Sequence, residues 1–174
     1  MKAHGITTTS KKVFTVDLFD EKSLSDAINR FVNQAKGNIT DATEQAIEIL
    51  CEAGTEKAKR EVPQMPPTAT GELRDSIHDE VVREGNKVEG RIIAGTDHAM
   101  FVEFGTGLVG ASDPHPYNYL GWEYDVNNHG TDGWNYPKNG RYYHTLGQRS
   151  NPFMYRTAKY LSENAERILI EGVR

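Results

Sequence analysis

The forty residues Ser23–Val62, SLSDAINRFVNQAKGNITDATEQAIEILCEAGTEKAKREV, decide the fold of this chain. Apolar residues recur in this stretch at spacings of three and four, which places them on one face of an α-helix. They are Leu24, Ile28, Phe31, Ala35, Ile39, Ala42, Ala46, Ile49 and Ala53. Ser23 suits an N-cap, and the prolines from Pro63 onward end the helix. The pattern predicts one long helix with a bend at Gly37-Asn38, since both are poor helix formers.

A continuous helix of this length would measure about 55 Å, which exceeds the core of a small domain. It must therefore either fold back on itself or reach out to a partner, and the second option favours a role in assembly. Cys51 is the only cysteine of the chain and lies within this helical pattern. A disulfide framework within one chain is therefore excluded.

The segments around this helix predict the rest of the fold. Before it, the polar lead-in of residues 1–20 holds one short strand at Val13–Leu18. After it, Thr70 suits the N-cap of a short helix, and two strand-like runs meet at Glu84-Gly85-Asn86 as a hairpin. A C-terminal helix follows Pro152, which suits its first turn. The expected fold is α+β in a single domain of residues 1–174, with the long N-terminal helix and the C-terminal helix packed on a small, mainly antiparallel sheet.

The stretch AMFVEFGTG, residues 99–107, sets one acid in an apolar run that ends at two glycines. We expect a helical turn that leads into a strand. The carboxylate of Glu103 is interpreted as structural, accepting hydrogen bonds from the Gly-Thr-Gly backbone or pairing with an arginine such as Arg74. The alternative is a catalytic role together with His98 or Asp97.

Residues 108–150 contain both tryptophans and six of the eight tyrosines, but no sustained helix or strand period. They are predicted to form a long aromatic loop. One interpretation is a docking arm that leaves the sheet at Gly105 and Gly107, with Thr106 bonding a local backbone group. The aromatic anchors of this arm would be Trp122, Tyr124, Trp134 and Tyr136. The other interpretation is a loop that folds back over its own sheet.

No pattern in the chain predicts a cofactor, metal ion or nucleophile. The histidines considered as metal ligands, His98, His115, His129 and His144, form no H-x-x-x-H or H-E-x-x-H pair. No serine lies in a G-x-S-x-G motif, and the Gly-Thr-Gly stretch has no P-loop lysine. The net charge of −5 argues against a general DNA-binding face. No run is apolar enough for a signal peptide or a membrane span, which favours a soluble protein of the cytoplasm.

Three motifs in a fixed order carry a resemblance to a known family. TGELRDSI is followed by A-x-F-V-E-F-G-T-G, and then by G-Q-x-x-x-P-F-M at the start of the last helix. This order resembles the gene-ten-like minor tail component family of long-tailed lambdoid bacteriophages, also called neck or tail-completion proteins. The matching positions are Thr70, Gly71, Leu73, Arg74, Ile77, Ala99, Val102, Glu103, Gly105, Thr106, Gly107, Gly147, Gln148, Pro152, Phe153 and Ala158.

The resemblance implies a virion protein without enzymatic activity. It implies a subunit of a homo-oligomeric ring at the head–tail junction, assembled in the bacterial cytoplasm and in contact with connector proteins, tail proteins and passing DNA. No membrane or sequence-specific DNA recognition is implied, and an acidic ring suits a conduit through which DNA slides. Two other classes stay open: a phage hydrolase or maturation enzyme that uses Glu103 and His98, and a monomeric adaptor on the host side.

Overall fold

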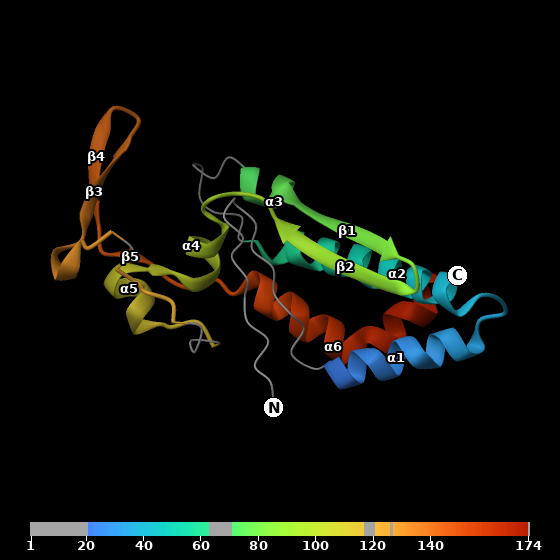
Figure 1. The fold of residues 1–174 in the computed structure, drawn as a ribbon. Helices are drawn as coiled ribbons and strands as arrows, with labels where there is room; N and C mark the ends of the chain where they lie inside the picture. Colours follow the sequence, from blue (N-terminus) through green and yellow to red (C-terminus); the bar gives the residue numbers. More distant parts are fainter. Residues whose placement is uncertain (1–20, 63–70, 117–120, 126, 174) are drawn as a thin grey trace. The chain divides into compact units, whose positions relative to one another are not determined.

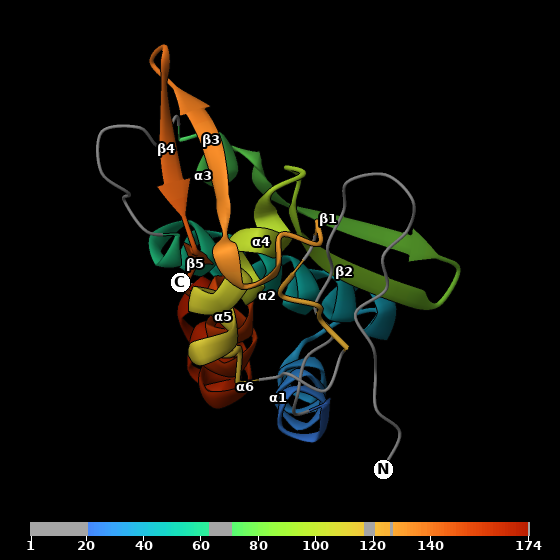
Figure 2. The same cartoon turned by 90° about the vertical axis from the view of Figure 1, so that its left-hand side faces the viewer.

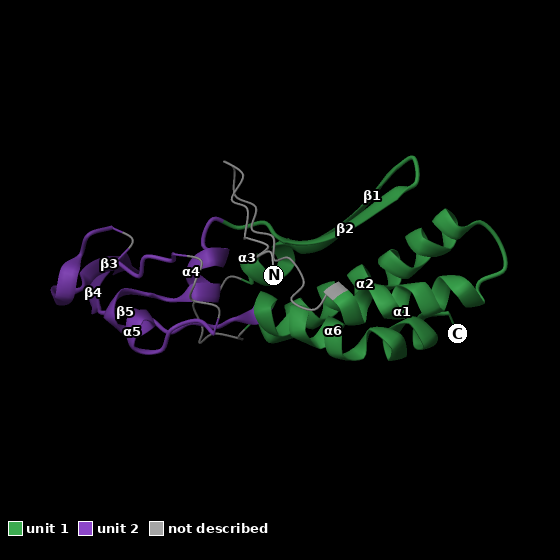
Figure 3. Ribbon diagram, turned by 60° about the horizontal axis from the view of Figure 1, so that its bottom comes forward, with its two compact units in different colours: residues 1–96, 154–174 green, residues 97–153 purple. Residues whose placement is uncertain are grey.

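The computed structural model describes residues 21–62, 71–116, 121–125 and 127–173. The strand predicted at Val13–Leu18 lies outside these residues, and so does Thr70. The chain forms two compact units (Figure 3). Unit 1 contains residues 1–96 and 154–174, and unit 2 contains residues 97–153. The single domain of residues 1–174 stays a prediction, and each unit is described separately below.

The N-terminal helical pattern forms two helices, α1 (Glu21–Gln34) and α2 (Ile39–Glu61). The break lies at Gly37-Asn38, as predicted, but the prediction of a single continuous helix is wrong. Gly37 has a φ of +148°, and the side chain of Asn38 accepts hydrogen bonds from the N–H groups of Thr40 and Asp41. This cap begins a new helix, and α1 packs against α2 (Figure 1). The chain therefore folds back, and the protruding helix that favoured assembly is absent from the described part of unit 1.

Two residues near the helix ends have other roles than predicted. Ser23 lies inside α1 instead of capping it, and its hydroxyl donates to the Ser162 carbonyl at 3.3 Å. Ile39, predicted in the apolar stripe, is the first residue of α2 and is 72% exposed. The predicted apolar stripe is therefore divided into two parts, one on α1 and one on α2.

The predicted hairpin of unit 1 is confirmed. Strands β1 (Ile77–Glu84) and β2 (Lys87–Ala94) pair antiparallel, and α2 packs on them (Figure 1). Gly85 has a φ of +61°, which suits a two-residue hairpin turn. The strand β2 approaches α2 at Gly90, where an added Cβ would lie 2.5 Å from the Cys51 sulfur. Cys51 lies on α2 and is buried.

The core of unit 1 lies between its helices and the hairpin. The C-terminal helix α6 (Phe153–Gly172) is confirmed, and Pro152 directly precedes it. The buried cluster consists of Ala27, Ala46, Leu50, Leu161, Ala165, Ile168 and Leu169, with Ile92 of β2 packed against it. The N- and C-terminal helices therefore pack on an antiparallel sheet, and the α+β fold class is confirmed.

The short helix α3 (Glu72–Ser76) precedes β1 in unit 1. Its first described flanking residue is Gly71, with a φ of +78° and no side-chain capping bond. The cap predicted at Thr70 lies outside the described residues. Ile77, one of the motif positions, begins β1 and is 1% exposed. The helix α3 therefore ends at Ser76, and the strand buries Ile77.

Unit 2 contains regular structure where a long loop was predicted. Its elements are α4 (Ala99–Phe104), α5 (Gly107–Ser112), the 3-10 turn η2 (Gly130–Asp132), β3 (Trp134–Lys138), β4 (Arg141–Thr145) and β5 (Gly147–Gln148). The prediction of a structureless loop at residues 108–150 is therefore wrong. Strands β3 and β4 pair as an antiparallel hairpin that extends from the rest of the unit (Figure 2).

Candidate functional site

The base of unit 2 is an aromatic cluster built on α4. Phe104 is 2% exposed, and its ring lies 5.1 Å from the Trp122 ring in a stacked arrangement. The indole Nε1 of Trp122 donates to the Gly105 carbonyl at 3.0 Å. Trp122 therefore fixes the segment after α5 to the end of α4, and it is half-buried instead of serving as an exposed anchor.

The acid of the AMFVEFGTG stretch is buried within unit 2. Glu103 Oε1 lies 3.0 Å from His115 Nε2, with the two side chains 1% and 2% exposed. The His115 ring also packs on Phe104 at 4.5 Å between ring centres. The prediction that the Gly-Thr-Gly backbone donates to the Glu103 carboxylate is wrong. The N–H group of Gly105 donates to the Phe101 carbonyl, and that of Gly107 donates to the Tyr124 carbonyl.

Sequence reasoning considered His115 only as a metal ligand and missed its contact with Glu103. The two residues are twelve positions apart and follow no helix or strand period. Arg74, the other suggested partner, is exposed on α3. The available signal was an acid in an apolar run with several histidines elsewhere in the chain. Spacing alone does not select His115 among them.

The Gly-Thr-Gly motif brings two backbone segments together. Gly105 and Gly107 have φ values of +79° and +61°, and Thr106 and Gly107 pair with Gln148 and Gly147 as isolated β-bridges. A Cβ on Gly105 would lie 2.6 Å from the Ser150 nitrogen. The motif therefore supplies close backbone approach and not a strand that leaves a sheet.

Side chains complete this seam between α4 and residues 147–151. Gln148 Nε2 donates to the Phe101 carbonyl, and the Ser150 hydroxyl donates to the Glu103 carbonyl, each at 2.6 Å. Thr106 occupies the N-cap position of α5, but its side chain makes no capping bond there, so its expected role is wrong. The seam is held by backbone pairing and by these two amide and hydroxyl donors.

The β3–β4 hairpin presents aromatic side chains to solvent. Tyr136 is 38% exposed, Tyr142 is 79% exposed and Tyr143 is 41% exposed. The rings of Tyr136 and Tyr143 stack across the strands at 5.9 Å. Tyr136 is thus an exposed residue of the predicted arm, and these three tyrosines are named here the tyrosine arm. Sequence reasoning missed Tyr142 and Tyr143.

A turn signal could have found this hairpin. Asn139 and Gly140 have φ values of +51° and +72° and link the two strands. An Asn-Gly pair between two short aromatic runs is a strong hairpin signal. Pro137 obscured it, because proline argues against a strand interior except at an edge. In a two-stranded hairpin each strand is an edge, so Pro137 is tolerated.

The two remaining predicted anchors lie at the base of the arm. Trp134 is half-buried, and its ring stacks on the His129 ring at 4.8 Å. Tyr124 is also half-buried, and its hydroxyl accepts a hydrogen bond from the backbone N–H of His115 at 3.2 Å. These residues support the hairpin and leave the tyrosine arm as the exposed part of the segment.

The histidines considered as metal ligands are not brought together as a metal site. His129 stacks on Trp134, whereas His144 Nδ1 lies 3.3 Å from the Asn135 side-chain oxygen. Among the residues that the structure describes, no group of three or more His, Cys, Asp or Glu side chains could hold a metal ion. A cavity of about 330 Å³ in unit 2 is lined by His98, Phe101, Val102, Thr106, Tyr124, Asp125, Asn127, His129, Trp134 and Gln148.

The carboxylate in this cavity is hydrogen-bonded to the neighbouring backbone. Asp125 accepts hydrogen bonds from the backbone N–H groups of His129 and Gly130, at 2.6 and 2.9 Å. Glu103, which was considered for catalysis with His98, is not among the residues that line the cavity.

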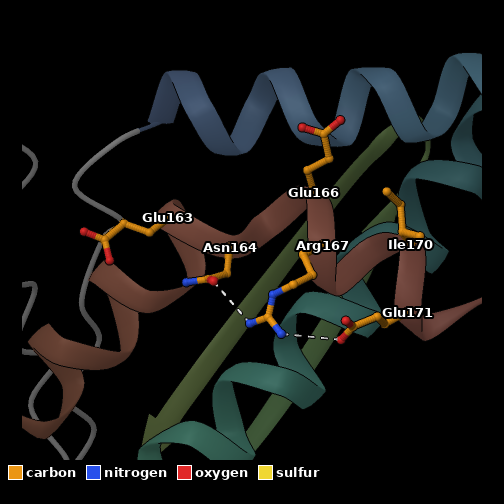
Figure 4. Close-up of a pocket in the computed structure, with 6 residues that line it drawn as sticks. All are labelled: Glu163, Asn164, Glu166, Arg167, Ile170 and Glu171. Atoms are coloured by element: carbon orange, nitrogen blue, oxygen red, sulfur yellow. Dashed lines mark hydrogen bonds and ion pairs between the residues drawn. The ribbon is translucent and has the colours of Figure 1, made fainter.

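A second hollow, of about 520 Å³, lies along the exposed face of α6 (Figure 4). Its lining residues are Glu163, Asn164, Glu166, Arg167, Ile170 and Glu171. The guanidinium of Arg167 points toward Asn164 and Glu171, at 3.1 and 3.7 Å. The cation is thus engaged within its own helix, and the hollow is a surface feature of α6.

The other motif residues lie at or near the beginnings of α3 and α6. Phe153 is fully buried at the start of α6, and Pro152 before it is half-buried. Gly71 precedes α3, on which Arg74 is exposed. These positions shape helix ends and bury the first turn of α6. In the described parts of the chain, no helix has the length and apolar character that a membrane span requires.

A family comparison identifies the class of protein that this chain represents. Residues 12–105, more than half of the chain, match the model of the HK97-gp10-like family, described as "Bacteriophage HK97-gp10, putative tail-component". The chain belongs to this family. It is therefore a bacteriophage tail component, as the motif resemblance predicted. The matched range includes the β1–β2 hairpin and α4 and ends at Gly105. No curated protein and no solved structure matched the chain.

Proposed function

We propose that this tail component is a neck or tail-completion protein, a subunit of a ring that forms where the phage head joins the tail. The family match supports a structural role in the virion, in contact with other head and tail proteins. In this proposal the ring surrounds the DNA conduit, and the net charge of −5 suits DNA that passes without specific binding.

The observation that carries the proposal is the tyrosine arm. This small hairpin exposes three tyrosines to solvent, with Tyr142 79% exposed. Exposed aromatic patches of this kind mark surfaces that bind a partner. Tyrosine supplies large contact area at low conformational cost, and it is enriched where protein interfaces bind most strongly. The base of unit 2 is fixed by the Glu103–His115 contact and by Trp122, so the arm extends from an ordered support.

A catalytic role is less well supported. The Glu103 carboxylate is 1% exposed and contacts His115, so no substrate reaches it in this arrangement. A monomeric adaptor on the host side would also use exposed aromatics, but the family description favours the tail. The neck role and the adaptor role are distinguished by whether the chain joins copies of itself and becomes part of the virion.

The test is complementation of a phage that lacks the gene. Replacing Tyr136, Tyr142 and Tyr143 with serine should leave the fold intact, because the hairpin is exposed on both faces. We expect separate filled heads and tails in place of joined virions, counted by electron microscopy. The matched control replaces the same residues with phenylalanine, which keeps the apolar rings, and should support joining. Normal virion yield with the serine variant would contradict the proposal.

A further inference from the structure

The tip of the β3–β4 hairpin carries two positive charges that oppose each other. Lys138 and Arg141 are directly paired across the strands, a position in which like charges repel. Lys138 lies 6.0 Å from the centre of the Tyr143 ring, and neither base forms an ion pair with a residue that the structure describes. Residues 133–150 hold three bases and no acid. The third base, Arg149, lies 3.8 Å from Asp113.

A complementary arrangement of negative charges lies on α2. Glu48, Glu52 and Glu56 are exposed on three successive turns, which places them about 6 Å apart along the helix. Acids at this spacing destabilise a helix. Within the described ranges no ion pair involves any of the three. Neighbouring cations pair with other acids: Lys57 with Glu61, and Arg83 with Asp41 and Glu44.

We propose that these two surfaces bind each other between copies of the chain, so that the hairpin tip of one copy docks across the Glu48–Glu56 stripe of the next. This inference rests on the proposed role as a ring subunit, and it names the two surfaces that join the subunits. The contact is heterologous, because each copy offers a different surface to each of two neighbours. Such contacts form a ring when the rotation between copies closes.

The spacing of the charges fits this contact. Residues opposed across an antiparallel pair have Cα atoms about 4.5–5.5 Å apart, close to the rise of one helical turn. Lys138 and Arg141 can therefore each face a separate glutamate. Side chains alternate between the two faces of a strand, so Tyr136 and Tyr143 lie on the same face as Lys138 and Arg141. These two rings can cover the aliphatic stems of the glutamates. Docking removes the repulsion within both surfaces at once.

A second copy suits this hairpin better than DNA does. Two cations at the tip are a small electrostatic footprint for a phosphate backbone, and the whole chain is acidic. The unpaired acids on α2 provide a receptor of matching sign within the same sequence.

The test is charge reversal with sedimentation velocity as the measurement. The hairpin variant carries Lys138→Glu and Arg141→Glu, and the stripe variant carries Glu48→Lys, Glu52→Lys and Glu56→Lys. Each places like charges in contact, so we expect self-association to weaken at least about 100-fold relative to the unmodified chain. The matched control, Lys22→Glu with Lys36→Glu, changes the net charge as the hairpin variant does but at exposed sites elsewhere. It should associate normally.

Rescue distinguishes a specific contact from a general charge effect. The two variants mixed in equal amounts, or their substitutions combined in one chain, restore opposite charges at the contact. We expect association to return to within about tenfold of the unmodified chain. Association should also weaken as the salt concentration rises, because exposed charges are screened.

Several results would overturn the inference. An unmodified chain that stays monomeric at all concentrations, or variants that associate normally, would contradict the contact. Loss of association without rescue would exclude the pairing of these two surfaces. Binding of labelled duplex DNA that is lost only in the hairpin variant, without self-association, would assign the hairpin to DNA instead. The neck assignment fails separately, if the chain is not needed for head–tail joining in the complementation assay.

Discussion

The two units of this chain are stabilised in different ways. Unit 1 buries an apolar cluster contributed by α1, α2 and α6, with Leu50 and Leu169 at 5% and 1% exposure. Unit 2 is held at its base by positive-φ glycines, by the buried contact of Glu103 with His115 and by Trp122 stacked on Phe104. The stability of unit 1 is therefore spread over many apolar side chains, whereas unit 2 depends on a few close contacts at its base.

The largest expected effect is at Gly147 in unit 2. Gly147 has a φ of +110°, and an added Cβ would overlap the Thr106 carbonyl. Gly147→Ala should lower the free energy of unfolding of unit 2 by at least about 3 kcal/mol, through backbone strain and the lost bridge. Hydrogen exchange followed by mass spectrometry should show fast exchange in residues 97–153 and slow exchange in α2.

The control for that prediction is Gly121→Ala. Gly121 also has a positive φ, +71°, but among the described residues an added Cβ meets nothing within 4 Å. The cost should be about 1–2 kcal/mol, from the backbone conformation alone. Equal effects at the two glycines would contradict the close-approach explanation of the seam.

Removing an aromatic ring from the base of unit 2 should have the next largest effect. Phe104 is 2% exposed and packs against both His115 and Trp122, so Phe104→Ala should cost about 3–5 kcal/mol. Phe31, on α1, is only partly buried against the core of unit 1. Phe31→Ala should therefore cost about 1–3 kcal/mol, less than a fully buried phenylalanine. Chemical denaturation gives the loss in unfolding free energy, and hydrogen exchange assigns each loss to its unit. A larger loss for Phe31→Ala than for Phe104→Ala would contradict the difference proposed between the two units.

The buried Glu103–His115 contact should contribute an intermediate amount. Glu103→Ala should destabilise unit 2 by about 1–3 kcal/mol, because the histidine keeps a buried polar atom without its partner. Glu103→Gln keeps an acceptor in place and should cost less. A double-mutant cycle with His115→Ala should give a coupling energy of about 0.5–3 kcal/mol. Additive losses would show that the two side chains do not stabilise each other.

The last effect concerns Cys51 in unit 1, and it is absent at neutral pH and appears only in alkaline solution. Burial, helped by the negative charge of Asp79, raises the pKa of the Cys51 thiol from 9.0 to about 11. The unfolded chain therefore loses this proton first as the pH rises. The contribution is complete below about pH 9, and stability falls by up to about 1.4 kcal/mol per pH unit between pH 9 and 11.

The measurement is the free energy of unfolding at a series of pH values, compared with the Cys51→Ala variant. The variant should lack this component of the alkaline slope, although other groups titrate in both proteins. The thiol should also resist modification at pH 8 until unit 1 unfolds. Identical slopes in the two proteins would contradict the assignment to Cys51.

Sequence patterns predicted unit 1 better than unit 2. Helix periodicity identified the face of α2 that buries Ala46, and the Gly85-Asn86 turn located the β1–β2 hairpin. The same periodicity runs across Gly37, so it cannot distinguish one bent helix from two helices that pack together. That distinction depends on the conformation of Gly37 and on the cap at Asn38.

Unit 2 could not be predicted in the same way because its contacts are not periodic. His115 meets Glu103 and Trp122 meets Gly105 across 12 and 17 positions, and no spacing rule selects such pairs. The chain length of the insert and its tyrosines did indicate a surface segment. The exposed part is the tyrosine arm, whereas Trp122 and Trp134 belong to its base.

The proposed ring of this chain at the junction of head and tail is tested most directly by a cryo-electron microscopy reconstruction of the neck of the phage that encodes it. We predict a ring of copies at the joint, in which the β3–β4 hairpin of each copy lies on α2 of the next. A neck without this chain, or single copies that make no contact with one another, would contradict the proposal.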